Sequence, residues 1–367
     1  MFSPKFTITN QLLKNISDLE AARGVIDNAV LVPAWERKFE KEAIEKTVFH
    51  GAHLEGNDLS FDQAKKIIEH IDGRKSLATI SQQAGLEADK KDVQEIINYR
   101  NVLRHLALLQ EKHQRVGGRF LYYKESELKA IHQLALEEIF AEEGLGKYRD
   151  TRLVLRDSSG EVSFKPPPPV EVPYQIEHFF EWLNSLTGRE VHPVIRAGIT
   201  HCELIRIYPF AEGSGPTARA FAALVLFREG YAVNRFFSLE EYFDKDAASY
   251  YQALRGVSKK GGDLTGWLEY FTLGLAVEFE KIKKKVKKLD SDTVLKERGQ
   301  QIALSDRQIK IIEFLRKNTE ITVREGRKVL PGLSDDTILR EIKDLMKKKV
   351  VVKRGSTKAA RYVLKEI

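Results

Sequence analysis

The feature that most constrains the fold of this chain is a short turn within residues 207–219, between two apolar runs with helical periodicity. The first run ends at Arg206, the turn carries Gly213 and Gly215, and the second run covers residues 217–229. Glycine tolerates backbone angles that other residues avoid and lets a ligand approach closely. A loop that leads into a helix N-terminus also presents backbone N–H groups at the positive end of the helix dipole. The sequence therefore predicts an anion-binding turn, suited to phosphate.

The composition indicates a protein of a reducing compartment. With 367 residues and 42% hydrophobic content, the chain can bury one large core and carry a smaller module. Cys202 is the single cysteine, which excludes a disulfide framework and a thiolate metal site. The chain starts without a signal-peptide pattern, and its longest apolar run, residues 221–227, is too short to span a bilayer. We therefore expect a soluble cytoplasmic protein with no membrane partner.

The chain divides by pattern into four regions. Apolar residues spaced three and four apart predict helices before residue 115 and again over 174–285. The lysine-rich stretch 281–288 indicates a linker or an exposed helix end. We expect an N-terminal helical region at 1–115, a helical core at 116–285, a linker at 286–303 and a small C-terminal domain at 304–367.

A β-hairpin is predicted within residues 151–165. Residues 152–156 and 161–165 alternate polar and apolar side chains around the turn sequence of residues 157–160. The proline run 166–169 then ends the second strand. This hairpin is either an ordinary surface hairpin or an edge that pairs with an extended segment of another protein, which requires no specific side chain.

The last region predicts a winged helix-turn-helix. Ser305 and Ser334 are placed to cap helices, a short helix follows Thr322, and two strands at 350–353 and 361–364 follow the helices. From residue 291 onward there are 19 Lys and Arg against 11 Asp and Glu, a net charge of +8. Because the whole chain carries +7, the first 290 residues carry −1, and the basicity belongs to this region.

The basic C-terminal region is a candidate for binding duplex DNA. In DNA-binding versions of this pattern one helix enters the major groove while lysines and arginines neutralise phosphates. Asp335 and Asp336, at the start of that helix, oppose this because they would repel phosphate. Docking of a protein partner therefore remains the alternative. The candidate DNA contacts are Arg340, Lys343, Lys353, Arg354 and Lys358.

The turn resembles the motif of the Fic (Fido) family, HPFx(D/E)GNGRxxR. Matching positions are Pro209, Phe210, Glu212, Gly213, Gly215 and Arg219. Three positions differ: the motif His is Tyr208, the Asn is Ser214 and the first Arg is Pro216. The resemblance implies a mainly α fold, a Fic-like helical core with a β-hairpin flap, beside the small α+β winged-helix domain. It also implies transfer of AMP from ATP to a protein hydroxyl.

The same resemblance implies that residues of the turn bind the nucleotide and a metal ion. Gly213, Ser214, Gly215 and Arg219 would bind the nucleotide. Glu212 would hold Mg²⁺, although a lone carboxylate beside a glycine turn can also simply cap backbone N–H groups. ATP with Mg²⁺ is thus the implied cofactor pair, and the flap at 151–165 would pair with a target protein.

Residues 50–57 resemble the family's inhibitory helix motif, (S/T)xxxE(G/N). Glu55 and Gly56 fall on its last two positions, and Gly51 replaces the Ser or Thr. A glycine here favours a helix stop, which leaves Glu55 in a last turn where the dipole disfavours a carboxylate, so Glu55 needs a cation. In the family that cation is the second motif Arg, here Arg219, and the pair blocks the place of the ATP γ-phosphate. The alternative is a surface glutamate beside a turn.

The altered motif weakens the implied chemistry. Tyr208 is a poor base, because with a reference pKa of about 10 only about one molecule in a thousand is phenolate at pH 7. Pro216 removes a guanidinium contact to phosphate worth roughly 1.5–3 kcal/mol. At the first helical position, where we expect it, proline is structurally well tolerated.

Two functions of different class fit these residues. The first is a weakened or inactive nucleotide-binding Fic scaffold, coupled in regulation to a DNA-binding winged helix. The second is an active AMPylase-like nucleotidyltransferase, or a transferase with another donor, in which Tyr208 and the remaining residues work in a rearranged site. The sequence leaves the donor, the target protein and the formation of a homodimer open.

Overall fold

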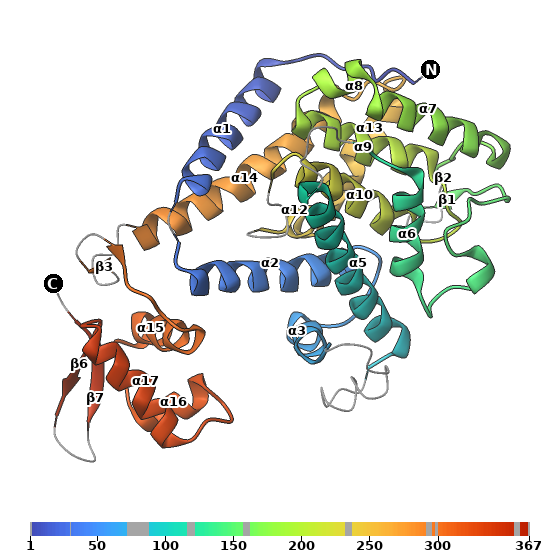
Figure 1. The fold of residues 1–367 in the computed structure, drawn as a ribbon. Coiled ribbons are helices and arrows are strands. Elements are labelled where there is room, and N and C mark those ends of the chain that lie inside the picture. The colour runs from blue at the N-terminus through green and yellow to red at the C-terminus, as the bar shows by residue number, and fades with distance from the viewer. Residues whose placement is uncertain are drawn as a thin grey trace. The chain divides into compact units, whose positions relative to one another are not determined.

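The computed structural model describes residues 2–29, 31–71, 88–115, 122–156, 162–231, 237–290, 296–297, 300–355 and 360–365 (Figure 1). Helices dominate these residues, as the sequence predicts. The chain forms two compact units. One contains Met1–Ala21 and Glu42–Phe279, and the other contains Ala22–Lys41 and Glu280–Ile367. In the described part of the chain, the helices are all too short or too polar to cross a bilayer.

Long helices form the first part of the chain. These are α1 (Asn10–Asp27), α2 (Pro33–His53), α3 (Phe61–His70) and α5 (Lys90–Arg115). The end of α1 and the start of α2 belong to the second unit. Helix α3 starts at a capping box. The Ser60 hydroxyl accepts a hydrogen bond from the Gln63 backbone N–H, and the Gln63 side-chain oxygen accepts one from the Ser60 backbone N–H. Helix α5 buries Val93, Ile96 and Ile97, the three-and-four spacing from which the sequence predicts a helix.

The centre of this unit is the helix pair α9 (Pro193–Ile207) and α10 (Ser214–Arg228), joined by the glycine turn. Helix α10 is buried on nearly every side, which fits its almost continuous apolar sequence. Trp182 and Trp267 are buried. The other helices of this unit are α6 (Glu125–Leu136), η1 (Glu142–Gly144), η2 (Pro169–Glu171), α7 (Val172–Asn184), α8 (Leu186–Glu190), α12 (Leu239–Lys245), α13 (Ala247–Lys259) and the first part of α14 (Thr265–Asp290). From Glu280 onward α14 belongs to the second unit.

The hairpin is present but shorter than predicted. Strands β1 (Leu155–Arg156) and β2 (Val162–Phe164) pair antiparallel, with Leu155 opposite Phe164. The register shifts between Leu155 and Arg156, and this irregularity limits the regular pairing. The predicted turn, residues 157–160, lies outside the described residues.

The segment predicted as a linker, residues 286–303, contains regular structure. Helix α14 continues to Asp290, so the lysine-rich stretch is helical. Two short strands, β3 (Lys296–Glu297) and β4 (Gln300–Gln301), then pair antiparallel. Alternation over two residues is too short to give a strand signal in the sequence.

The C-terminal part of the second unit has the predicted order of three helices and a hairpin. Its elements are α15 (Asp306–Asn318), β5 (Glu320–Ile321), α16 (Val323–Val329), α17 (Asp335–Lys347), β6 (Val351–Arg354) and β7 (Arg361–Leu364). Ser305 and Ser334 cap α15 and α17, as predicted, and Thr322 caps α16. Strand β5 adds to the hairpin and makes a sheet in the order β5-β7-β6. Its two residues carry no pattern from which the sequence could predict it.

Candidate functional site

The turn between α9 and α10 is held in an unusual backbone conformation. Tyr208 ends α9 with φ 47° and ψ 65°, in the left-handed region, and Gly213 has φ 65° just before α10 begins. A non-glycine residue in this region costs on the order of 1–3 kcal/mol and persists only where its surroundings enforce it. The strain at Tyr208 therefore requires contacts that hold its main chain.

Arg149 supplies those contacts. Its buried guanidinium donates from Nε to the carbonyl of Tyr208 at 2.8 Å, and from Nη2 to the carbonyls of Ile207 and Pro167. The Arg149 backbone N–H donates to the Pro209 carbonyl at 2.9 Å. One side chain thus ties the turn to the proline run after the hairpin. The sequence gives no spacing that marks this role.

Helix α10 begins earlier than predicted. Gly213 is its N-cap and Ser214 its first residue, so Pro216 is the third helical residue rather than the first. The first four N–H groups of a helix have no partner within the helix, so proline at this position still removes no helical hydrogen bond. The fold therefore tolerates Pro216, while the N–H that it lacks is one fewer donor for an anion.

Ser214 closes the turn on itself. Its buried hydroxyl accepts from the Phe210 N–H at 3.0 Å and donates to the Phe210 carbonyl at 3.1 Å. Both hydrogen bonds stay within the loop. Ser214 therefore shapes the anion-binding turn with its side chain, and its backbone N–H is the group that a ligand could reach.

His132, which sequence reasoning missed, supports the turn from α6. Its ring stacks on Phe210 with centroids 3.8 Å apart. The Gly146 N–H donates to Nδ1 at 2.9 Å, so Nε2 carries the proton and donates to the Glu212 carbonyl at 3.1 Å. Burial lowers the pKa of His132 to about 4. The ring is thus neutral at pH 7, as both hydrogen bonds require.

Glu55 lies against Arg219. Helix α2 ends at His53, Gly56 takes φ 91° two residues after Leu54, and Glu55 Oε1 lies 2.8 Å from Arg219 Nη2. The same Nη2 donates to the Gly51 carbonyl at 3.1 Å. The Arg219 side chain is 2% exposed and that of Glu55 is 37% exposed. Although burial opposes its charge, Glu55 raises the pKa of Arg219 above its ordinary value.

Two glycines make this approach possible. A Cβ on Gly215 would lie 2.8 Å from Glu55 Oε1, so a larger residue would displace the carboxylate from its present place. A Cβ on Gly51 would lie 2.7 Å from the Tyr99 ring. Tyr99 is buried and donates to Glu240 at 3.2 Å, so its ring is fixed there. Tyr99 therefore occupies the space that a Ser or Thr side chain at residue 51 would need.

Tyr208 carries a phenol that stays protonated. Burial, and then the carboxylates of Glu55 and Glu212, raise its pKa to about 12. At pH 7 about one molecule in 100,000 would then be phenolate. The side chain can donate a hydrogen bond in the pocket, but it has almost no capacity to accept a proton from a hydroxyl.

Glu212 is exposed at the outer part of the turn. Among the described residues, His, Cys, Asp and Glu form no cluster of three that could hold a metal ion. Mg²⁺ is commonly bound by one or two carboxylates together with phosphates of a substrate. Glu212 alone fits that arrangement only in company with a bound nucleotide.

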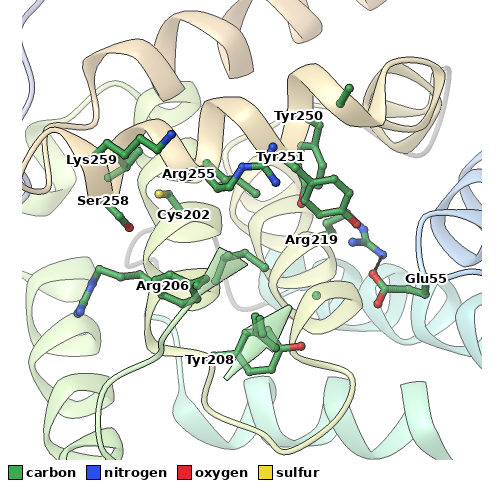
Figure 2. A pocket seen from close by; sticks show the side chains of 17 residues that line it. Glu55, Cys202, Arg206, Tyr208, Arg219, Tyr250, Tyr251, Arg255, Ser258 and Lys259 are labelled. Atoms are coloured by element: carbon green, nitrogen blue, oxygen red, sulfur yellow. Dashed lines mark ion pairs between the residues drawn. The ribbon is translucent and has the colours of Figure 1, made fainter. Parts of the chain in front are cut away.

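Tyr208, Gly215, Arg219 and Glu55 line a cavity of about 610 Å³, whereas the predicted site residues Glu212, Gly213 and Ser214 are not part of its wall. Such a volume is in the range of pockets for drug-sized ligands, roughly 300–1,000 Å³. Figure 2 shows Tyr208 and the Arg219–Glu55 pair on its wall, together with side chains of α13. The sequence did not indicate the contribution of α13, which consists of Ala248, Tyr250, Tyr251, Leu254, Arg255, Val257, Ser258 and Lys259.

The C-terminal cations lie on exposed surface of the second unit. Arg340 and Lys343 are exposed on α17, whose opposite side buries Ile338, Ile342 and Leu345. Lys353 and Arg354 are exposed on β6, and Lys358 lies outside the described residues. Asp335, whose charge argues against DNA binding, is paired with Arg327. The Arg327 Nε and Nη2 each donate to one carboxylate oxygen of Asp335, both at 2.6 Å.

Comparisons with known proteins identify the helical core. Residues 122–226 match the Fic/DOC family model. The chain is 28% identical over 221 residues to protein adenylyltransferase Fic of Culex quinquefasciatus, covering 59% of this chain and 39% of that protein. It is 30% identical over 198 residues to the protein of the same name from Aedes aegypti, covering 53% and 34%. The chain thus spans little more than a third of these relatives.

Two solved structures resemble the fold. A Fic family protein from Desulfovibrio desulfuricans G20 superposes with a TM-score of 0.62 at 19% identity, covering 99% of this chain and 98% of that one. Fic-1 (residues 134–508) from C. elegans gives 0.57 at 22% identity, covering 75% and 74%. The mainly α architecture is that of the Fic fold.

Proposed function

We propose that the Fic domain at residues 122–226 serves a regulatory protein that binds a nucleotide but transfers AMP weakly or not at all. The observation that carries this proposal is the state of Tyr208. Tyr208 occupies the position at which the Fic motif has histidine. Because its pKa is raised to about 12, the site has no base near neutral pH. Pro216 removes a second element of the motif, a guanidinium for the phosphates.

Nucleotide binding is supported by what the turn retains. Gly213 and Gly215 keep the backbone open at the N-terminus of α10, and Arg219 supplies a buried cation. Such a helix start and a guanidinium are both favourable for phosphate. The cavity beside them has the volume for a nucleotide. Mg²⁺ would neutralise the phosphates from the side of Glu212.

Glu55 is proposed to gate this binding. Its carboxylate takes the contact with Arg219 that a phosphate would use, and repels an anion that approaches the same turn. Because the Glu55 side chain is more than a third exposed, the carboxylate can be displaced into water without breaking the core.

Calorimetric titration of Glu55→Gly with ATP and Mg²⁺ tests the proposal. We expect at least about tenfold tighter binding than in the unaltered chain, which corresponds to about 1.4 kcal/mol. Glu143→Gly is the matched control, because Glu143 is an exposed glutamate of the same unit away from the cavity. Equally weak heats of binding in the unaltered chain, Glu55→Gly and Glu143→Gly would contradict the proposed nucleotide binding.

The active transferase is the second candidate. Incubation of Glu55→Gly with ATP and Mg²⁺, followed by intact mass, separates the two. ATP binding without covalent attachment of AMP to any protein supports the regulatory scaffold. Accumulation of an AMP adduct on the protein or on a co-incubated target would instead show that Tyr208 and the altered turn sustain transfer.

We also propose that the C-terminal basic region binds duplex DNA. Its three capped helices and three-stranded sheet fit a winged-helix arrangement, in which α17 would be the recognition helix. The exposed cations on α17 and β6 supply phosphate contacts, and the Arg327–Asp335 pair reduces the repulsion at the helix start.

A further inference from the structure

The wall of the cavity carries two cations that the anion-binding turn does not use. Arg255 and Lys259 lie one turn apart on α13 and both line the cavity. Figure 2 shows Lys259 and Ser258 on the side opposite to the Arg219–Glu55 pair, with Arg255 between them. The cavity therefore has positive charge at two separated places.

The acidic residues that line the cavity do not neutralise Arg255 and Lys259. Glu55 is the one acidic residue that lines the cavity, and it is engaged by Arg219. Arg206 also lines the cavity, but its guanidinium holds both carboxylate oxygens of Glu203, at 2.7 and 2.8 Å. Among described residues, no carboxylate lies within ion-pair distance of Arg255 or Lys259.

Arg255 and Lys259 carry like charges one turn apart, and an anion between them would relieve their repulsion. Like charges four residues apart on a helix repel and destabilise it. Both side chains are exposed, so they can turn toward a ligand. Ser258, between them in sequence, adds a hydroxyl to the same wall.

We propose that the cavity binds a ligand with two separated anionic groups, of the nucleoside 3′,5′-bisphosphate class. One phosphate would lie at the glycine turn beside Arg219, and the second between Arg255 and Lys259. The base of such a ligand would face Tyr250, Tyr251 and Leu254, an aromatic and apolar stretch of wall. This inference rests on the proposed function, since it names the class of nucleotide that the same pocket prefers.

The test compares adenosine 3′,5′-bisphosphate with AMP by calorimetry, in the Glu55→Gly protein so that Glu55 does not limit either ligand. We expect the bisphosphate to bind at least about tenfold more tightly than AMP, because two cations can hold its second phosphate. Adding Arg255→Gln and Lys259→Gln should bring the ratio of the two affinities to within about twofold of 1. Lys260→Gln is the control, because Lys260 follows in sequence but does not line the cavity.

The outcomes separate this inference from the proposed function. Equal affinity for the two ligands in the Glu55→Gly protein would overturn the second anion site and leave nucleotide binding intact. Preference for the bisphosphate that survives the Arg255→Gln and Lys259→Gln substitutions would also overturn it, since the second phosphate would then be held elsewhere. Absence of binding by both ligands would remove the proposed function and this inference together.

Discussion

Glu55 Oε1 lies 2.8 Å from Arg219 Nη2, and the same nitrogen reaches the Gly51 carbonyl at 3.1 Å. One buried guanidinium therefore contacts the last turn of α2 at Gly51 and the segment after the helix at Glu55. Arg219 Nε has no hydrogen-bond partner among the described residues. Glu55 supplies the counter-charge to this buried guanidinium, so the pair contributes to stability as well as to occupancy of the pocket.

Glu55→Gln should destabilise the first unit. The amide keeps the shape of the side chain but leaves the Arg219 guanidinium buried without a counter-charge, at a cost of about 1–3 kcal/mol. ATP with Mg²⁺ should restore part of this loss, because a phosphate supplies the missing negative charge. Urea unfolding with and without ligand measures both effects. A variant as stable as the unaltered chain would show that Glu55 does not support Arg219.

Gly51→Ser should be destabilising, although it would bring the chain closer to the resembling inhibitory motif. The added Cβ meets the Tyr99 ring at 2.7 Å, and overpacking of this kind costs about 1–3 kcal/mol. In a Tyr99→Ala background the same change should cost much less, which unfolding measurements in a double-mutant cycle would reveal. Gly266→Ser is the control, since a Cβ on Gly266 meets nothing within 4 Å. Equal costs in both backgrounds would contradict this explanation of Gly51.

The local parts of this fold could be predicted from the sequence, and the site could be predicted only in part. Helix starts follow from single capping residues such as Ser305 and Ser334, whose effect is confined to one turn. The position of Glu55 against Arg219 was expected only through the resemblance to a family motif. Contacts across long sequence separations, such as Arg149 with the Tyr208 carbonyl, leave no periodic trace. The α13 wall was missed because side chains that line a cavity share the spacing of ordinary helix faces.

His132 should make the first unit less stable in mild acid. Its folded-state pKa is lowered to about 4, below the ordinary value near 6.5, so between these values the unfolded chain binds the proton and the folded chain does not. Stability is therefore fully present above pH 6.5 and falls as pH decreases to about 4, by about 3 kcal/mol from this group. Urea unfolding across this range should show a steeper pH dependence for the unaltered chain than for His132→Gln. Parallel pH profiles would rule out the buried neutral ring.

The C-terminal region should bind duplex DNA with a strong dependence on salt. Each phosphate contact contributes about 0.9 to the slope of log affinity against log salt, so Arg340→Gln with Lys343→Gln should reduce that slope by about 2. Lys317→Gln, an exposed lysine on α15, is the matched control and should leave the slope unchanged. Fluorescence anisotropy measures DNA binding at several salt concentrations for the unaltered full chain, the double variant and the control. Binding that is absent, or insensitive to salt, would point to a protein partner instead.

Restoring two side chains should recover AMP transfer if the altered turn is the reason for its loss. Tyr208→His supplies a base that can accept the proton of a target hydroxyl, whose oxygen then attacks the α-phosphorus of ATP while pyrophosphate leaves. Pro216→Arg supplies a guanidinium and a backbone N–H to the phosphates. Ser214 is left in place, because its buried hydroxyl holds both polar atoms of the Phe210 main chain and a larger side chain would disturb the turn.

In a Glu55→Gly background, these two substitutions should raise the rate of AMP incorporation by about 10² or more, the usual contribution of a general base. Intact mass of the protein after incubation with ATP and Mg²⁺ reports self-modification without a known target. Tyr208→Phe together with Pro216→Arg is the control, because it provides the phosphate contacts without a base. If that control is as active as the histidine variant, the base at residue 208 does not limit transfer. If the restored protein binds ATP and forms no adduct, the loss of activity has a cause beyond the turn.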